Sequence, residues 1–408
     1  MRHSLLKDID IEMKRRGVEA LIVLGDTTLA NPDLTYVVGS SLARGGIYFK
    51  RVGCKPILLT STLDVQNARK GHVKNAFTLT DYGFEKLIVK HGQSDAYPKL
   101  ILRVLKELGA EGKVVIAGRN DLAAGTELTD KLRTLGVRIS GENSPTILEA
   151  ARETKSSAEL HEIRDVGNRT TKVIEKVLAK LRSAKRTRGG LVSDGEVATV
   201  GTVKRFISIQ LAEGGLTAPE GTIFAVGPSS ADPHNSGVSN AKIKEHRLIV
   251  FDIFPQSESG YWFDLTRTFV IGRPDKRAQH LYQAVQEAHD ASIGILRDGL
   301  PAKLAMSQAC DIIESHGFRT VRDIYDGKAR ELRAGFIHSL GHGVGLTIGE
   351  RPYLSLQNTS SLKAGSVVTV EPGVYVPKYG GVRIEDTVHV TDKGCEILSK
   401  TRKEFELY

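Results

Sequence analysis

Carboxylate side chains interrupt two apolar, strand-like segments in the second half of the chain. The first segment, LIVFDIFPQSESGYWFDLTRTFVIG over 248–272, is typical of two antiparallel strands joined by a polar turn. If the turn centres on Glu258, Asp252 lies directly opposite Asp264. Cross-strand partners are roughly 4.5–5.5 Å apart at Cβ, and two like charges there destabilise the pair. Because carboxylates are also costly to bury in apolar strands, the pair predicts a cation between them.

The same arrangement recurs in SVVTVEPGVYVPKYGGVRIEDTVHV over 366–390. A turn centred on Lys378 places Glu371 opposite Glu385. Alternation along the second strand puts Glu385 on a polar face. The apolar face of that strand is formed by Val382, Ile384, Val388 and Val390. One opposed acidic pair is more often an accident of surface strands, but two pairs in apolar hairpins favour a cation site.

The charge of four carboxylates is balanced by two divalent ions. Oxygen-rich ligands with few nitrogens and no thiolate favour manganese, cobalt or zinc in a dinuclear cluster, with the ions about 3.5–4 Å apart. The segment HSLGHGVG over 338–345 offers a nitrogen ligand, because His342 stands between two glycines. On its own, a histidine beside glycine is more often a turn residue. Next to the acidic hairpins we interpret His342 as a neutral imidazole ligand whose glycines let the backbone approach the cluster.

The elements that must position these residues fall into two regions. A chain of 408 residues is too long for one ordinary core, which predicts an N-terminal domain over 1–150 and a catalytic domain over 151–408. The first region predicts an α/β domain with a mostly parallel or mixed sheet and strands at 19–25, 34–39, 45–49, 55–60, 113–118 and 137–140. Its helices are predicted at 1–16, 97–109 and 127–135. No GxGxxG follows these strands, so a dinucleotide site is not expected.

The second region opens on the junction ETKSSAEL, which predicts a capping serine before a long helix whose apolar period runs from Leu160 to Val177. Further helices are predicted near 191–213, 276–297 and 301–316. Strands are predicted near 220–227, 247–254, 261–271, 366–371 and 381–391. The fold class of the whole chain is therefore α/β, or α+β.

Charge and cysteine content narrow the class of protein. The net charge of +9 is modest, and the basic run KRTRGG over 185–190 lacks interleaved aromatics, so we interpret it as a solvated loop between helices rather than a nucleic-acid patch. Cys54, Cys310 and Cys395 form no CxxC and leave an odd thiol, which fits a reducing cytoplasm. No run reaches 18 apolar residues, and the N-terminus predicts a charged amphipathic helix rather than a signal peptide. We expect a soluble, cytoplasmic protein with no nucleic-acid or membrane partner.

Four sequence blocks in this order, FDIF…GYWFDLTRTF, HSLGHGVG, VEPGVY and GVRIEDT, resemble the clan of creatinase, prolidase and methionine aminopeptidase, which has the pita-bread fold. More narrowly, they resemble the Xaa-Pro peptidases, aminopeptidase P and prolidase. The resemblance covers nearly the whole chain, since PDLTYVVGSS is similar to the creatinase-like N-terminal domain and RETKSSAELHEIR to the junction. Methionine aminopeptidase is disfavoured because a full domain precedes the catalytic one. The resemblance implies a pita-bread catalytic domain in a homodimer.

The resemblance also implies roles for individual residues. The metal ligands would be Asp252, Asp264, His342, Glu371 and Glu385, supported by Arg383 beside Glu385. Asp264 and Glu385 would bridge two ions, and Glu371 would also act as the proton-transferring base. The block ADPHNSG places His234 near the substrate, and His338 matches a second pocket histidine. The implied reaction is hydrolysis, by a metal-bridging hydroxide, of the peptide bond before a proline at the second position.

Two departures from the family pattern leave alternatives open. The spacing between Asp252 and Asp264 is one residue longer than the common one, which a turn or bulge can absorb. The family usually has a histidine seven residues after the metal histidine, thought to hold the scissile carbonyl, and this chain has Gly349 there. His338 or Arg351 could replace the missing donor. The alternative is a weakly active relative or a metal-dependent non-peptidase, such as a lyase or a hydrolase of small C–N compounds. An inactive, interaction-only relative is disfavoured because all five ligand types are present; the native metal and the preferred peptide length stay open.

Overall fold

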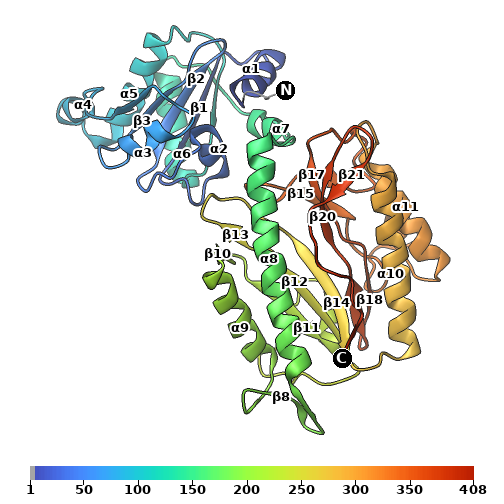
Figure 1. Ribbon diagram of the computed structural model, residues 1–408. Coiled ribbons are helices and arrows are strands. Elements are labelled where there is room, and N and C mark those ends of the chain that lie inside the picture. The colour runs from blue at the N-terminus through green and yellow to red at the C-terminus, as the bar shows by residue number, and fades with distance from the viewer. Residues whose placement is uncertain (1–4) are drawn as a thin grey trace. The chain divides into compact units, whose positions relative to one another are not determined.

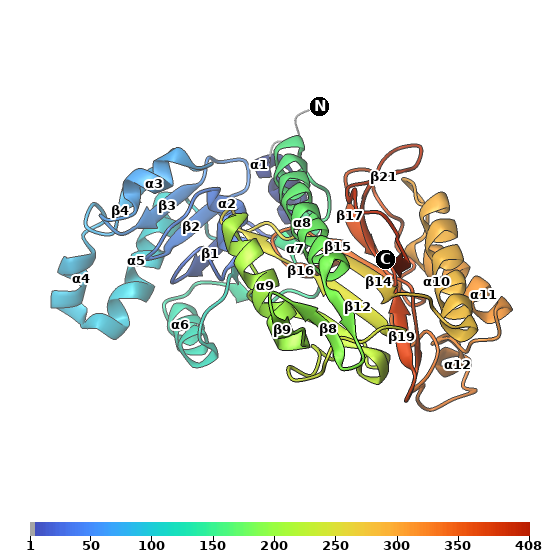
Figure 2. The same ribbon diagram turned by 60° about the horizontal axis from the view of Figure 1, so that its bottom comes forward.

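The computed structural model describes residues 5–408. The chain forms two compact units, Met1–Arg152 and Glu153–Tyr408, which are described separately. Figures 1 and 2 show the elements of both units. Among the described residues, no helix has the length and apolar character needed to cross a bilayer.

The N-terminal unit is built on a mixed sheet. Its strands are β1 (Ala20–Gly25), β2 (Gly46–Arg51), β3 (Ile57–Thr60), β4 (Ala76–Thr78), β5 (Val114–Ala117) and β6 (Ile139–Ser140). They pair in the order β4-β3-β2-β1-β5-β6, with β1 antiparallel to β2 and parallel to β5. The helices are α1 (Leu5–Arg15), α2 (Pro32–Val38), α3 (Val65–Lys70), α4 (Phe84–His91), α5 (Gln93–Glu107), α6 (Leu122–Thr134) and α7 (Ile147–Arg152). Residues 1–4 of the predicted first helix lie outside the described residues.

The strand predicted at 34–39 is wrong, because this segment is helix α2. Asn31 caps the helix by accepting a hydrogen bond from the Leu34 amide at 3.1 Å. Pro32 fits the first turn of a helix, and Gly39 ends it with a φ of +67°. The capping residues therefore outweigh the strand preference of the apolar run between them.

The C-terminal unit begins with the predicted long helix, α8 (Ser157–Ser183). Ser156 and Glu159 form a capping box at its start, which confirms the predicted capping serine. The other helices are α9 (Val200–Glu213), α10 (Lys276–Ile295), α11 (Ala302–Ser315), α12 (Arg322–Tyr325) and the short 3-10 helix η1 (Gly227–Ala231). Helices α10 and α11 confirm the predictions at 276–297 and 301–316.

Two larger sheets form the centre of this unit. The first has the order β11-β12-β14-β22, with β11 (Thr222–Val226), β12 (Leu248–Ile253), β14 (Leu265–Ile271) and β22 (Glu406–Leu407). The second has the order β16-β15-β17-β20-β21, with β15 (Gly341–Val344), β16 (Ile348–Leu354), β17 (Val367–Val370), β20 (Asp386–Val390) and β21 (Cys395–Ile397). Helices α8 and α9 share a core with the first sheet, and α10 and α11 share one with the second (Figures 1 and 2).

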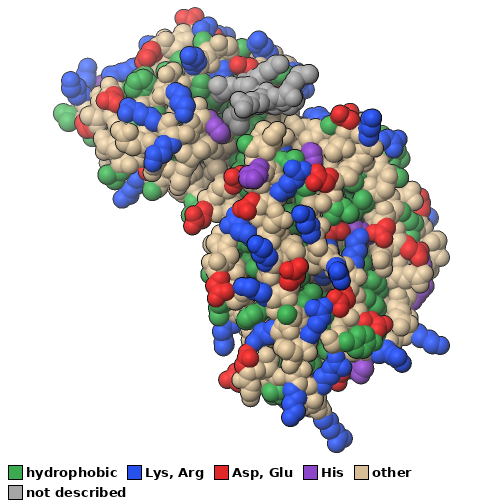
Figure 3. Space-filling view, viewed as in Figure 1, with side chains coloured by type: hydrophobic (Ala, Val, Ile, Leu, Met, Phe, Trp, Pro, Cys, Tyr) green, Lys and Arg blue, Asp and Glu red, His purple; other side chains and the backbone are tan. Residues whose placement is uncertain are grey.

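Smaller hairpins complete the unit. They are β7 (Lys185–Thr187) with β8 (Gly190–Ser193) and β9 (Glu196–Val197), β10 (Leu216–Thr217) with β13 (Gln256–Ser257), and β18 (Gly373–Val376) with β19 (Gly380–Arg383). The helix predicted near 191–213 is present as α9 but begins only at Val200, because Asp194 and Gly195 take positive φ values of 52° and 81° and close the turn between β8 and β9. The loop predicted at 185–190 is wrong, because β7 pairs antiparallel with β8 there. On the face drawn in Figure 3, basic and acidic side chains are interspersed over the surface of this unit.

The two acidic hairpins differ in how closely they follow the predicted register. In the second, Gly373 pairs with Arg383 and Val370 with Asp386, which confirms the register that sets Glu371 opposite Glu385. In the first, Asp252 pairs with Thr266 rather than Asp264, so the predicted register is wrong by two residues. The turn is centred one residue later than predicted, because Gly260 takes a φ of +89° and donates to the Ser257 carbonyl at 2.9 Å.

Candidate metal centre

The five predicted ligands converge where the two larger sheets meet. Asp252 lies on β12, and Asp264 immediately precedes β14. His342 lies on β15, Glu371 directly follows β17, and Glu385 lies between β19 and β20. One ligand atom from each of Asp264, His342 and Glu385 lies within 4.8 Å of the others. His342 Nε2 is 3.6 Å from an Asp264 oxygen and 3.4 Å from a Glu371 oxygen.

Three carboxylate oxygens of this group are buried and have no hydrogen-bond partner within residues 5–408. They are Asp252 Oδ1, Asp264 Oδ1 and Glu385 Oε1. Buried polar atoms are nearly always satisfied, and a buried carboxylate oxygen without a partner is costly. Divalent cations satisfy such oxygens, so the donor set, oxygen-rich with one imidazole and no thiolate, fits the predicted metal ions.

The pKa values of the carboxyl groups also indicate that the site lacks enough positive charge. Burial raises the pKa of Asp264 well above its ordinary value, and the neighbouring Glu385, Asp252 and Glu371 raise it further. Burial likewise raises the pKa of Glu385, with Glu371 and Asp252 adding to the shift. The pKa of Glu371 is raised to about 8 by burial, against the opposing effect of Arg383. Cations at this site would return these carboxyls to their ionised form.

Arg383 is the buried cation within the group. Its guanidinium donates to Asp252 Oδ2 at 2.6 Å and to the Tyr375 hydroxyl at 2.8 Å. The resemblance implied that Arg383 supports the ligands beside Glu385, but in the structure Arg383 forms its ion pair with Asp252. Arg383 therefore fixes the one ligand that lies within a regular strand of the first sheet.

His342 is held with one ring nitrogen free for a metal. Its Nδ1 lies 3.1 Å from the Gly343 carbonyl, which requires the proton on Nδ1 and leaves the Nε2 lone pair available. Its backbone amide donates to Thr369 Oγ1, and that hydroxyl donates to Glu371 at 3.2 Å. The neighbouring glycines serve close strand packing, because a Cβ on Gly341 would lie 2.0 Å from the Thr369 carbonyl oxygen. This differs from the predicted role of letting the backbone approach the cluster.

Of the two predicted pocket histidines, His338 contacts Tyr375, and His234 follows a residue that contacts Arg383. His338 Nε2 is 2.9 Å from the Tyr375 hydroxyl, and Nδ1 is 2.8 Å from the Ser339 carbonyl. Burial lowers the pKa of His338 to about 4, with Arg383 and the imidazoles of His234 and His342 adding to the shift, so the ring is neutral at pH 7. The segment carrying His234 is tied here because Arg383 donates to the Pro233 carbonyl. The His234 side chain itself is exposed.

Gly349 leaves an open position next to a rigid turn. Its φ is +76°, and a Cβ added there would meet nothing within 4 Å. The next residue, Glu350, is buried and forms an ion pair with Lys155, and it also accepts a hydrogen bond from Thr347 at 3.1 Å. Arg351 is partly exposed on the same strand. A side chain at position 349 would therefore start in open space, although at a positive φ.

Sequence reasoning missed Tyr375, Thr266 and Thr369 as parts of the site. Thr266 donates to Glu385 Oε2 at 2.6 Å, in addition to the contacts of Tyr375 and Thr369 given above. A signal was available for both threonines. Each stands two residues from a carboxylate ligand, Thr266 after Asp264 and Thr369 before Glu371, and residues two apart share one face of a strand.

Comparisons with known proteins agree with this geometry. Residues 161–392 match the sequence model of metallopeptidase family M24. A curated relative, the Xaa-Pro dipeptidase of Pyrococcus furiosus, is 32% identical over 326 residues, which cover 78% of this chain and 88% of the relative. The crystal structure of the prolidase from Pyrococcus horikoshii OT3 aligns with a TM-score of 0.75 and 26% identity, covering 100% of both chains.

A further solved structure, the Xaa-Pro dipeptidase from Bacillus anthracis, aligns with a TM-score of 0.77 and 22% identity, covering 99% of both chains. At that identity the match speaks for the fold alone. Together the matches confirm the predicted pita-bread fold and the resemblance of the motif blocks to the Xaa-Pro peptidases.

Proposed function

Because the chain belongs to metallopeptidase family M24 and is a metallopeptidase, we propose that it hydrolyses Xaa-Pro peptide bonds with two bound divalent ions. The ions would be held by Asp252, Asp264, His342, Glu371 and Glu385. The observation that carries the proposal is the set of three buried carboxylate oxygens without partners around the group formed by Asp264, His342 and Glu385. When bound, two divalent ions acidify a water molecule and polarise a substrate carbonyl.

Glu371 is suited to move a proton in this reaction. Its carboxyl oxygen lies 3.4 Å from His342 Nε2, inside the ligand group, so it would stand beside a water held there and could accept and then release a proton. Thr369 fixes the orientation of its carboxyl group by donating to Oε1 at 3.2 Å. We assign Glu371 the transfer of a proton from the attacking water to the leaving amine.

The two histidines take different parts. Both ring nitrogens of His338 face protein groups, so it orients the Tyr375 hydroxyl rather than the substrate. His234 is exposed beside the same cluster, and its imidazole makes no hydrogen bond within residues 5–408. We assign His234 the positioning of the substrate next to the carboxylates.

The substrate class is tested with a panel of peptides on manganese- or cobalt-loaded protein. Since the similar proteins are named Xaa-Pro dipeptidase and prolidase, we expect cleavage of Xaa-Pro dipeptides, slower cleavage of longer Xaa-Pro peptides, and none of matched Xaa-Ala peptides. Equal rates on the proline and alanine series would refute the substrate assignment.

Gly349 supports a second candidate function. The side chain thought to hold the scissile carbonyl is absent and the space is open, which suits a lyase or a hydrolase of small C–N compounds. Fully metal-loaded protein that cleaves no Xaa-Pro peptide would favour this candidate. The homodimer, the cytoplasmic location and the choice among manganese, cobalt and zinc stay predictions.

A further inference from the structure

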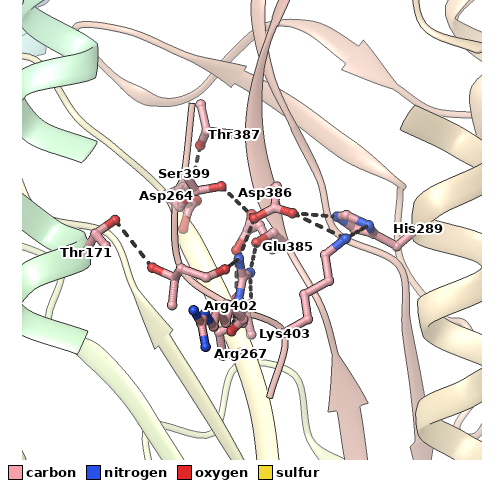
Figure 4. Close-up of polar contacts among 12 residues, drawn as sticks. Thr171, Asp264, Arg267, His289, Glu385, Asp386, Thr387, Ser399, Arg402 and Lys403 are labelled. Carbon is pink, nitrogen blue, oxygen red and sulfur yellow. Dashed lines mark hydrogen bonds and ion pairs between the residues drawn. The ribbon is translucent and has the colours of Figure 1, made fainter. Parts of the chain in front are cut away.

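A second polar cluster lies directly behind the candidate metal centre, between the two larger sheets (Figure 4). Arg267 on β14 and Asp386 on β20 form an ion pair of 2.6 Å across the sheets, and their side chains are only 3% and 2% exposed. The pair follows the ligands closely in sequence, since Arg267 stands three residues after Asp264 and Asp386 one residue after Glu385. Neither side chain belongs to the ligand group described above.

Arg267 fixes the backbone of Glu385, a predicted ligand that lies outside the strands. Strand β19 ends at Arg383 and β20 begins at Asp386, so Glu385 lies in the gap. One nitrogen of Arg267 donates to the Glu385 carbonyl at 2.6 Å and to the Thr266 carbonyl at 2.9 Å. The Glu385 amide in turn donates to the same Thr266 carbonyl at 3.1 Å. The orientation of Glu385 therefore depends on bonds from the opposite sheet.

A second hydrogen bond links the two sheets in the opposite direction, from β20 to the residue before β14. Thr387 on β20 is fully buried and donates through Oγ1 to the carbonyl of Asp264 at 2.7 Å. Asp264 precedes β14, so its backbone is also held by a side chain of the opposite sheet. The two residues predicted to bridge the ions are thus fixed reciprocally. Arg267, Asp386 and Thr387 are here called the inter-sheet clamp.

The clamp is held in place by further buried contacts to Asp386 and Arg267. Ser399 donates to Asp386 at 2.5 Å, and His289 of α10 lies 3.3 Å from its other oxygen. Arg267 also donates to the Thr401 carbonyl at 2.7 Å, so the C-terminal segment closes the cluster (Figure 4).

We propose that the inter-sheet clamp is a positioning device that sets the spacing of Asp264 and Glu385, so that metal affinity and coordination geometry depend on residues that touch no metal. The inference rests on the proposed metal centre. A purely structural role would lower stability alone. A positioning role would also change how a bound ion is coordinated, because the hydrogen bonds behind metal ligands set their orientation and their loss typically costs roughly 10–100-fold in metal affinity.

The test uses Arg267→Lys, which keeps a positive charge near Asp386 but cannot reproduce the several donor directions of the guanidinium. Its matched control is Arg152→Lys in the N-terminal unit, where a buried arginine pairs with Asp33 at 2.6 Å. Metal-free full-length proteins are titrated with cobalt(II) by calorimetry, and the visible spectrum of the bound cobalt is recorded. Thermal unfolding is measured for each protein without metal.

We expect Arg267→Lys to weaken cobalt binding by roughly 10–100-fold and to change the cobalt spectrum. Arg152→Lys should leave both unchanged, even where its unfolding temperature falls as far. A folded Arg267→Lys variant with wild-type affinity and spectrum would overturn the proposal. If the wild type binds two ions and the variants match it, only this inference fails, whereas a wild type that binds no cobalt removes the proposed function and this inference with it.

A second, milder variant decides the matter if Arg267→Lys does not fold. Thr387→Val removes only the hydroxyl that holds Asp264, and Thr170→Val is its control, because Thr170 is equally buried and its hydroxyl bonds within helix α8 to Val166 at 2.8 Å. We expect about tenfold weaker cobalt binding and a shifted spectrum for Thr387→Val alone. Identical behaviour of the two valine variants would overturn the proposal.

Discussion

Glu385 and Asp386 are neighbours in the chain, yet their surroundings are electrostatically opposite. Glu385 faces other carboxylates, and burial together with those neighbours raises its pKa well above the ordinary value. Asp386 faces Arg267, which with His289 holds its pKa below the ordinary range although the residue is as deeply buried. Burial is thus common to both, and what differs is whether the protein supplies the cation. The carboxylate of Asp386 has its counter-charge within the protein, whereas the carboxylate of Glu385 requires cations from solution.

The largest expected effect is on activity. Glu385→Ala and Asp264→Ala each remove a predicted bridging ligand, so both metal content and Xaa-Pro hydrolysis should be lost together, with activity falling roughly 10³-fold or more. Metal analysis of the purified variants and peptide hydrolysis under metal saturation check this. Two bound ions in both variants would contradict the bridging assignment.

The next effect is on stability and has opposite signs for the two neighbours. Asp386→Asn leaves the charge of Arg267 buried without a counter-charge, which should cost about 3–5 kcal/mol of unfolding free energy. Glu385→Gln removes a carboxyl from a repulsive cluster, so the metal-free protein should become more stable. Urea unfolding of metal-free proteins at pH 7.5 gives both values. A similar loss of unfolding free energy in both variants would contradict the opposite electrostatic surroundings of Glu385 and Asp386.

Gly349→His adds a hydrogen-bond donor near the candidate metal centre. The missing residue is a candidate oxyanion donor, so restoring it should raise kcat on Xaa-Pro substrates by about tenfold or more while metal content stays unchanged. Histidine is among the residues that tolerate a positive φ, and Gly349→Ala measures the backbone cost alone. If the wild type is already fast and the histidine slows it, a substitute donor exists, and Arg351→Ala should then lower kcat.

The smallest effect is the pH dependence of the metal-free protein. Folded Glu371 keeps its proton up to about pH 8, whereas the unfolded chain releases it near the ordinary value of 4.5. The folded state binds more protons between these values, so unfolding free energy should fall as pH rises, by about 1–2 kcal/mol from pH 6.5 to 8. The unfolded imidazole of His338 is half protonated at pH 6.5, so its lowered pKa in the folded state raises the unfolding free energy by about 0.4 kcal/mol over the same range, equally in both proteins compared. Urea unfolding at both pH values should show this fall in the wild type and a smaller one in Glu371→Gln. Equal dependence in the two proteins would contradict the raised pKa.

Local signals in the sequence were sufficient for much of the catalytic unit. The PKYGG turn and strict alternation set the register of the second hairpin, because Lys378 takes a φ of +67° at the predicted centre. The register of the first hairpin failed because the competing turn residue Gly260 moved its centre by one position. The hairpin at 190–197 had a visible signal, Asp194-Gly195, which the amphipathic pattern of the following helix obscured.

The inter-sheet clamp could not be predicted from these patterns. Strand alternation tells which residues share a face within one strand, and it correctly predicts that the side chains of Glu385 and Asp386 point to opposite faces. It does not tell which strand of another sheet lies behind them. The pairing of Arg267 with Asp386 spans 119 positions and joins two sheets, so it follows only from the packing of the whole unit.

The most direct test of the account is a calorimetric titration of metal-free protein with manganese(II), run in parallel with hydrolysis of an Xaa-Pro dipeptide. We expect about two ions bound per chain, as the charge of the four carboxylates requires, with activity rising as the ions bind. Stoichiometry near zero at saturating manganese, and equally at saturating cobalt and zinc, would contradict the metal centre and the peptidase function built on it.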